Sequence, residues 1–359
     1  MYDLLLQVPL LGMEWEPFLL LLIAALAGGA FGAALGALPA FVFTGFVVFL
    51  GEGLAILQRE VGGTVASVNP GELAAGVTGV IGFGAVTGPH IAFAGGVAAS
   101  AYAGKKYPEM EPDGWDYHFG KNILYAFGTK PDILAVGAVF GVLGMFINQI
   151  GAAIGTPTDT IALSVVLTAV IARVVFGYPL VGRPAGKGIL DMSPFEREEP
   201  HAAADGGEVA MEHEGRLATE PWLPHQYKWS GVAAIGVVGG ILGGFIWLKT
   251  GSIFLGYAIS AMSLLFLNLG VEKIPVTHHI TLIGAVGAVV VDPVAGGVVA
   301  LLAAGAFGAI SGLLGEVTQR IMYSHSGTHV DPPAMAIAIA MLVVGVLSIL
   351  GVLPNAGYL

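Results

Sequence analysis

Long apolar blocks separated by short polar segments make up most of the chain. They predict about eleven helices, over residues 17–37, 39–57, 72–87, 89–104, 132–150, 159–178, 230–248, 252–270, 277–291, 293–315 and 333–353. A helix needs about 20 apolar residues to cross the hydrocarbon core of a bilayer, and most of these blocks approach that length. The pattern therefore predicts an all-α integral membrane protein whose main surroundings are the lipid bilayer.

Two regions, 72–104 and 277–315, leave the number of crossings open. Gly88-Pro89 interrupts the first region, and Asp292-Pro293 interrupts the second, so that each contains short apolar blocks. Backbone that leaves the helical conformation inside a membrane must be buried in protein or line a cavity. Each region therefore either spans the membrane fully or forms half-helices that re-enter it.

The composition narrows the class of protein. Of the 359 residues, 55% are hydrophobic and only 11% are charged, whereas a soluble domain carries about 25% charged residues. The net charge of -11 leaves no basic stripe for nucleic acid. With no cysteine, disulfides and thiolate chemistry are excluded, and no Walker, nucleophile-elbow or Rossmann-type motif is present. We expect no cofactor and no enzymatic activity.

Two polar loops and the basic residues predict an orientation. Residues 105–131 form an aromatic loop, and residues 179–228 form an acidic loop that is expected to be solvated. With eleven crossings, an N-terminus in the cytoplasm places nearly all lysines and arginines on the cytoplasmic side, as the positive-inside rule requires. The expectation is a multi-pass protein of the cell membrane with a cytoplasmic N-terminus and an external C-terminus.

Short sequence elements recur in the same order in the two halves. A double GxxxG pattern occurs at Gly28, Gly32 and Gly36 and again at Gly236, Gly240 and Gly244. Ala-Gly-Gly-Val begins at residues 94 and 295, and Gly-Thr follows at residues 128 and 327. The order predicts two parallel five-helix repeats, an N-terminal one over 1–151 and a C-terminal one over 229–359. A linker helix over 152–178 and the acidic cytoplasmic loop over 179–228 would join them.

Gly-Thr-x-x-Asp occurs three times and ends in Asp132, Asp159 and Asp331. One interpretation is helix capping, since an aspartate at a helix start accepts hydrogen bonds from free backbone N–H groups. The other is that Asp132 and Asp331 bind a coupling cation. The predicted orientation places Asp159 on the opposite side of the membrane, so the three are not expected to share one site.

Ionisable side chains within the apolar regions are the strongest candidates for a substrate or ion site, because each is costly to bury in a membrane. His90 and Asp292 stand at the two interruptions, one in each half. A break in a membrane helix exposes N–H groups that bind ions. The alternative is that both residues lie in external loops.

Four histidines of the second half form a further candidate group. His278 and His279 begin one apolar block, and they are additional candidates for substrate binding. Together with His325 and His329 they are weak candidates for a metal site, because imidazole binds zinc, nickel and copper. The alternative is that these rings bond to loop carbonyls, since no spacing here is a specific metal motif.

These observations favour a permease that moves a small ion or polar solute along the interface between two repeats. The alternative is a structural or scaffold subunit of a membrane complex, in which the glycine stripes serve assembly with another subunit or with further copies of the chain. A membrane-embedded metal enzyme is a third option, and the absence of a carboxylate–histidine hydrolase motif disfavours it.

Overall fold

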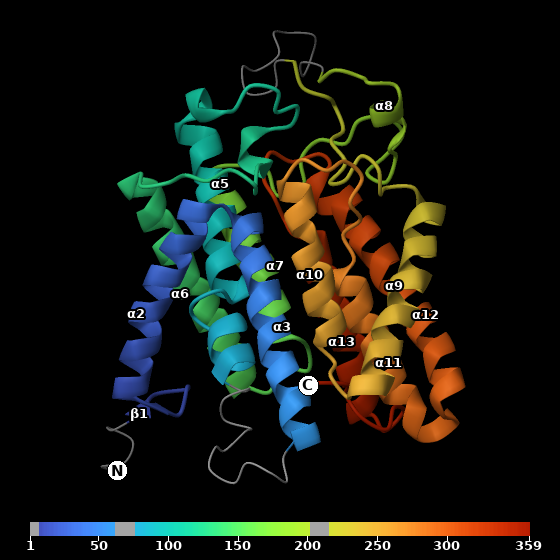
Figure 1. Cartoon of the computed structure of the whole chain (residues 1–359). Helices are drawn as coiled ribbons and strands as arrows, with labels where there is room; N and C mark the ends of the chain where they lie inside the picture. Colours follow the sequence, from blue (N-terminus) through green and yellow to red (C-terminus); the bar gives the residue numbers. More distant parts are fainter. Residues whose placement is uncertain (1–6, 62–75, 202–214) are drawn as a thin grey trace.

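The computed structural model describes residues 7–61, 76–201 and 215–359 (Figure 1). Apart from a hairpin of two short strands, β1 (Gln7–Val8) and β2 (Met13–Glu14), and an isolated bridge between Pro200 and Leu217, the regular secondary structure of the described chain is helical. The first half contains α2 (Trp15–Leu35), α3 (Ala37–Val61), α5 (Ala94–Lys106), α6 (Pro131–Ala153) and α7 (Thr160–Val175). The second half contains α9 (Trp229–Thr250), α10 (Leu255–Asn268), α11 (His278–Ala295), α12 (Gly297–Thr318) and α13 (Pro332–Ile349).

Shorter helical turns join these helices. The π-helical turns are η1 (Gly76–Gly82), η2 (Pro89–Phe93) and η7 (Gln319–Tyr323), and the 3-10 turns are η3 (Pro108–Met110) and η4 (Phe119–Lys121). A four-residue helix, α8 (Ser193–Glu196), lies in the loop between the halves.

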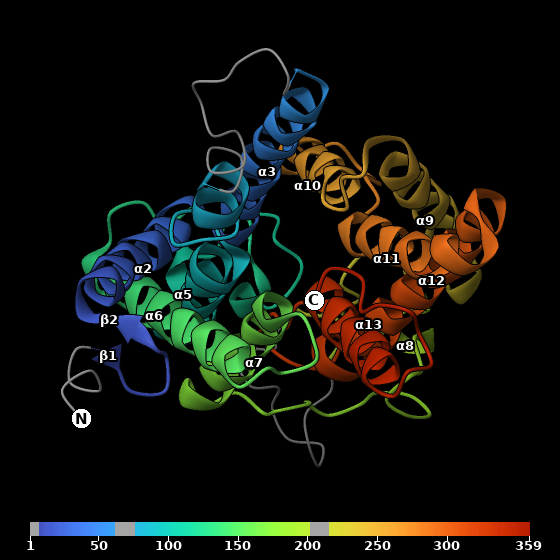
Figure 2. The same ribbon diagram turned by 90° about the horizontal axis from the view of Figure 1, so that it is seen from below.

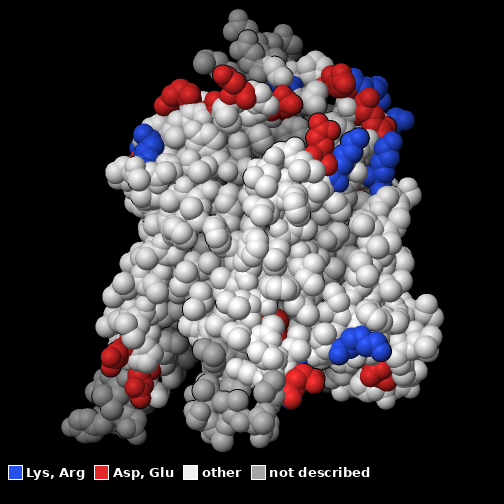
Figure 3. Space-filling model, in the orientation of Figure 1, with Lys and Arg blue, Asp and Glu red and all other residues white. Residues whose placement is uncertain are grey.

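The surface of the bundle suits a bilayer. Seven helices in the described part are long and apolar enough to cross a membrane: α2, α3, α6, α9, α11, α12 with η7, and α13. Figure 3 shows the charged side chains gathered at the two ends, with a broad uncharged belt between them. Large apolar side chains such as Ile23, Val139 and Leu302 are exposed on that belt. The prediction of an all-helical protein is confirmed, with helices that are long and apolar enough to span a membrane, while the count of eleven and the two-repeat arrangement stay predictions.

The helices form two groups that meet along two contacts (Figure 2). In the first half, α2 packs against α5 and α6, and in the second half α9 packs against α11 and α12. The halves touch where α3 packs against α10 and where α7 packs against α13.

Glycine allows the helix backbones within each half to touch. A Cβ added at Gly32 would lie 1.8 Å from the carbonyl oxygen of Ala92, and one at Gly240 would lie 2.2 Å from that of Ala304. Both glycines belong to the double GxxxG patterns. These patterns therefore pack helices closely, as small residues do in other membrane bundles.

The segment from η1 to α5 follows one path beside α3. The Thr78 hydroxyl donates to Glu52 over 3.2 Å, the Thr44 hydroxyl donates to the carbonyl of Thr87 over 2.5 Å, and Gly96 lies against Ala37. Residues 76–106 thus run antiparallel to α3 from one end of the bundle to the other. The predicted block 72–87 begins outside the described residues, and its described part, 76–87, continues into the block 89–104 as one interrupted path.

The path of residues 76–106 bears on the end of the bundle at which each end of the chain lies. Figure 1 places the start of α2 and the C-terminal residues at the same end of the bundle, with the long loops at the opposite end. The predicted placement of the two ends on opposite sides of a membrane counted two crossings between residues 72 and 104. The described part of this segment, residues 76–104, runs along the bundle once, and the side of a membrane on which each end lies stays a prediction.

Candidate functional site

A cavity of about 1220 Å³ lies between the two halves. Its walls come from α3, α7, α10, α11 and α13, which include the helices through which the halves touch. At the loop end it is bordered by Trp115 and Tyr117, and at the other end by Asn148 and Leu359. The cavity therefore extends along much of the bundle.

Two aspartates project into this cavity from helix starts. Asp159 is the N-cap of α7: its Oδ1 accepts from the backbone N–H of Ala162 over 2.8 Å, and its Oδ2 accepts from the Tyr358 hydroxyl over 2.6 Å. Asp331 is the N-cap of α13: its Oδ2 accepts from the N–H of Ala334 over 2.8 Å. The capping interpretation is confirmed for these two residues, and both also line the cavity.

The structure brings Asp159 and Asp331 to the wall of the same cavity, whereas Asp132 does not line it, so the three aspartates do not share one site. The start of α7 lies beside the middle of α13, where the Thr158 hydroxyl donates to the carbonyl of Ala338 over 2.6 Å. Tyr257, buried and lining the cavity, lies within electrostatic range of both carboxylates. The expected position of Asp159 and Asp331 on opposite sides of a membrane stays a prediction.

Two of the predicted histidines line the cavity. His329 is 1% exposed, and its Nε2 lies 3.0 Å from Oδ1 of Asp331. Its ring contacts the rings of Phe93 and Tyr323. His278 is also buried, with its ring centroid 4.7 Å from that of Phe41. These rings therefore extend the polar site around Asp331.

The other two histidines lie elsewhere. His279 is buried toward α12, where its carbonyl accepts from the Ser311 hydroxyl over 3.0 Å. His325 lies in the loop before α13, and its Nε2 lies 3.1 Å from the carbonyl oxygen of Ile189. Among the described residues, no three His, Asp or Glu side chains are placed to hold one metal ion. The structure therefore does not assemble the four histidines into a metal centre.

Three further predicted site residues lie outside the cavity. Asp132, in the first turn of α6, accepts from Tyr102 over 3.0 Å, from Tyr107 over 2.5 Å and from Lys106 over 3.0 Å near the surface. His90, in η2, is buried in the first half, where α2, α6 and α7 pack against that turn. Asp292 is half-buried near the end of α11. The structure does not bring His90 and Asp292 together at the cavity.

Arg173 positions the loop that carries His329 and Asp331. It is fully buried; its Nε donates to the Thr328 hydroxyl over 2.7 Å and its Nη2 to the Thr328 carbonyl over 2.8 Å. Its Nη1 donates to the carbonyl of Leu180 over 2.6 Å. The sequence alone could have indicated this role, because an arginine inside an apolar block usually faces the interior of a membrane protein.

A buried ion pair lies at the loop end of the cavity. Lys121, which lines the cavity, donates to Glu220 over 2.6 Å, and the two side chains are 1% and 6% exposed. Glu220 also accepts from the N–H of His118 at 3.2 Å. Burial lowers the pKa of the Lys121 ammonium, and the Glu220 carboxylate opposes that shift. The pair ties residue 220, at the end of the acidic loop, to the aromatic loop.

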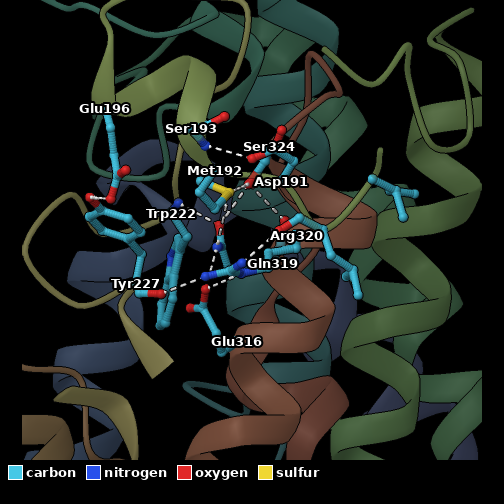
Figure 4. A network of polar contacts seen from close by, with 12 residues as sticks. Asp191, Met192, Ser193, Glu196, Trp222, Tyr227, Glu316, Gln319, Arg320 and Ser324 are labelled. Atoms are coloured by element: carbon cyan, nitrogen blue, oxygen red, sulfur yellow. Dashed lines mark hydrogen bonds and ion pairs between the residues drawn. The ribbon is translucent and has the colours of Figure 1, made fainter. Parts of the chain in front are cut away.

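A second polar network anchors the acidic loop to the second half (Figure 4). Arg320 donates to Glu316 over 2.6 Å and to the carbonyls of Leu190 over 2.6 Å and Tyr227 over 2.9 Å. Gln319 accepts from the N–H of Trp222 over 3.1 Å. These contacts fix the described parts of the loop to α12 and η7.

Asp191 stabilises a turn within the same loop. Its carboxylate accepts from the backbone N–H groups of Lys187 and Ser193, each over 2.9 Å. These hydrogen bonds lower the pKa of Asp191 to about 2. The turn therefore holds residues 187–193 in the shape that presents Leu190 to Arg320.

Comparison with known proteins identifies a family without identifying an activity. No curated protein and no solved structure matches the chain. The one family match reaches from residue 11 to residue 359, which includes both halves and the whole of the cavity lining. The chain therefore belongs to DUF7973, a family of unknown function.

Proposed function

We propose that this protein is a membrane permease that moves a small ion or polar solute through the interface between its two halves. The observation that carries the proposal is the cavity of about 1220 Å³ between the halves, with Asp159 and Asp331 on its wall. Ionisable groups inside a membrane protein mark substrate and ion pathways. A purely structural subunit has no need of two carboxylates on the wall of a cavity.

We further propose that the halves are five-crossing repeats of opposite orientation. In the described part, the contacts of α2, α6 and α7 in the first half match those of α9, α12 and α13 in the second. Figure 1 supports opposite directions, since α2 rises toward the loop end while α9 descends from it. Inverted repeats with a binding site at their interface are common in secondary transporters.

This arrangement differs from parallel repeats joined by a linker helix over 152–178. In the proposed form α7 is the fifth crossing of the first repeat, and the counterpart of Asp331 is Asp159, each at a helix start after a Gly-Thr pair. The Ala-Gly-Gly-Val segments then occupy different places, one at the start of α5 and the other at the junction of α11 and α12.

The basic residues support an orientation in the cell membrane. Lys105, Lys121, Lys187, Arg197 and Lys228 all belong to the loop end, whereas Arg59, which bonds to the carbonyl of Thr250, belongs to the other end. By the positive-inside rule the loop end is cytoplasmic. The start of α2 and the residues after α13 then lie on the external side.

Two-sided access to the cavity tests the permease without knowledge of its cargo. Since the chain contains no cysteine, Ala162→Cys and Ala334→Cys each introduce a single thiol on the cavity wall. A membrane-impermeant maleimide is applied to sealed vesicles of either orientation. A permease that alternates between two open states exposes each thiol to both faces of the membrane.

The control is Ala300→Cys, at a fully buried position of α12 that does not line the cavity. This thiol is expected to stay unlabelled from both sides. Labelling of the two cavity thiols from one face only, or from neither, would reject the permease and favour the scaffold subunit.

A further inference from the structure

We propose that the central cavity binds an organic cation, namely a substituted ammonium ion that carries an apolar group. The inference names the class of cargo for the proposed permease and rests on that function for transport, while binding itself is tested separately. It follows from the charge, the unused polar groups and the aromatic lining of the cavity.

The charge inside the cavity is negative. Among the described lining residues that belong to the bundle rather than to the loop end, the acidic side chains are Asp159 and Asp331, and none is lysine or arginine. Lys121 lines the loop end, where Glu220 neutralises it at 2.6 Å. Lys273 lies beside Glu272 in the sequence, between α10 and α11. A cation is therefore attracted to the middle of the cavity.

An anion is disfavoured at the same place. Helix starts attract anions because their N–H groups are free. Here Asp159 and Asp331 already occupy those groups on α7 and α13, so an anion would meet a carboxylate. Each carboxylate has about four acceptor sites and uses two in these contacts. Both carboxylates therefore keep unused acceptor sites that can face a positively charged ligand.

A buried polar side chain on the wall supports a ligand independently of the helix starts. His278 is 6% exposed and lines the cavity, and its Nδ1 has no hydrogen-bond partner among the described residues. Buried polar groups are nearly always paired, so an unpaired one on a cavity wall indicates a place for a ligand.

The apolar lining decides which kind of cation fits. The rings of Phe41, Phe83, Phe93 and Tyr257 line the cavity and contact one another, with Phe41 and Tyr257 centroids 6.0 Å apart. Aromatic faces attract cations that have lost water, and quaternary ammonium groups are bound in this way. A transition-metal ion such as zinc is typically held by a set of His, Asp or Glu ligands, and no group of three such side chains occurs among the described residues. The cavity is also much larger than a bare ion needs.

Binding to the purified full chain in detergent tests the proposal by titration calorimetry. Benzyltrimethylammonium is expected to bind more tightly than tetramethylammonium, because the cavity holds the apolar group. Choline is expected to bind more tightly than 3,3-dimethyl-1-butanol, which has the same shape without the charge. Equal binding of choline and the neutral alcohol, preferential binding of benzenesulfonate, or displacement of the ammonium probe by sodium at equal concentration would overturn the inference.

Asparagine substitutions locate the site without removing the helix caps, since Asn caps a helix start as well as Asp does. Asp159→Asn and Asp331→Asn are each expected to weaken benzyltrimethylammonium binding by about tenfold, which corresponds to about 1.4 kcal/mol. Asp132→Asn, which changes a carboxylate outside the cavity, is the matched control and should leave binding unchanged. Equal weakening in all three variants would reject the site.

Tyr257→Leu keeps both carboxylates and removes a ring face, so it tests the site even if an asparagine variant fails to fold. It is expected to weaken binding of benzyltrimethylammonium, and unchanged binding would count against the site. If the protein binds the cation but its cavity thiols are labelled from one face only, the binding site is supported and the permease function is rejected. If the thiols are labelled from both faces but no cation binds, the permease function is supported and this class of ligand is rejected.

Discussion

Removing one partner of the Lys121–Glu220 pair is expected to destabilise the protein strongly. Lys121→Met replaces an ammonium that donates to Glu220 over 2.6 Å, where the two side chains are 1% and 6% exposed. Glu220 then keeps the N–H of His118 at 3.2 Å but loses its opposite charge. A carboxylate left buried without a cation is much more costly than a lost surface contact.

The expected magnitude follows from burial. Removing one partner of a buried ion pair costs about 3–5 kcal/mol, whereas replacing both partners by neutral groups is often close to neutral. Lys121→Met and Glu220→Gln are therefore each expected to lower the free energy of unfolding by about 3 kcal/mol or more. The double variant should lose no more than either single variant, because Gln still accepts from His118 and no buried charge remains.

Unfolding of the purified protein in mixed micelles with increasing SDS measures these free energies. Lys187→Met, which changes an exposed lysine of the acidic loop, is the control and should stay within about 0.5 kcal/mol of the parent. Additive losses of about 6 kcal/mol or more in the double variant would refute the reasoning, because independent sites add and coupled ones do not.

Three further variants test other contacts by the same unfolding measurement. Gly240→Ala should cost about 1–3 kcal/mol, because its Cβ would lie 2.2 Å from the Ala304 oxygen; Gly231→Ala, with open space around it, should not destabilise. Arg173→Lys should lose about 3 kcal/mol, since an ammonium cannot reproduce the hydrogen bonds of the guanidinium fork, and a neutral result would contradict its positioning role. Tyr358→Phe should lose about 1.5–3 kcal/mol with its bond to Asp159, and an unchanged protein would show that this bond does not stabilise the fold.

The amino-acid sequence by itself determined the class of protein and the positions of most helices. The block predicted at 17–37 forms α2 at Trp15–Leu35, and that predicted at 230–248 forms α9 at Trp229–Thr250. The capping roles of Asp159 and Asp331 were also predictable. These features depend on local properties, namely the length of an apolar run and the hydrogen bonds available at a helix start.

Only the tertiary structure decided the path of residues 76–106 and which residues line the cavity. Whether that segment crosses once or twice depends on its contacts with α3, such as the hydrogen bond from Thr44 to Thr87. Asp159 and Asp331 share one cavity because α7 and α13 pack side by side, while His90 stays in the core of its own half. Such outcomes depend on contacts between residues far apart in the chain, and a pattern read along a single chain does not contain them.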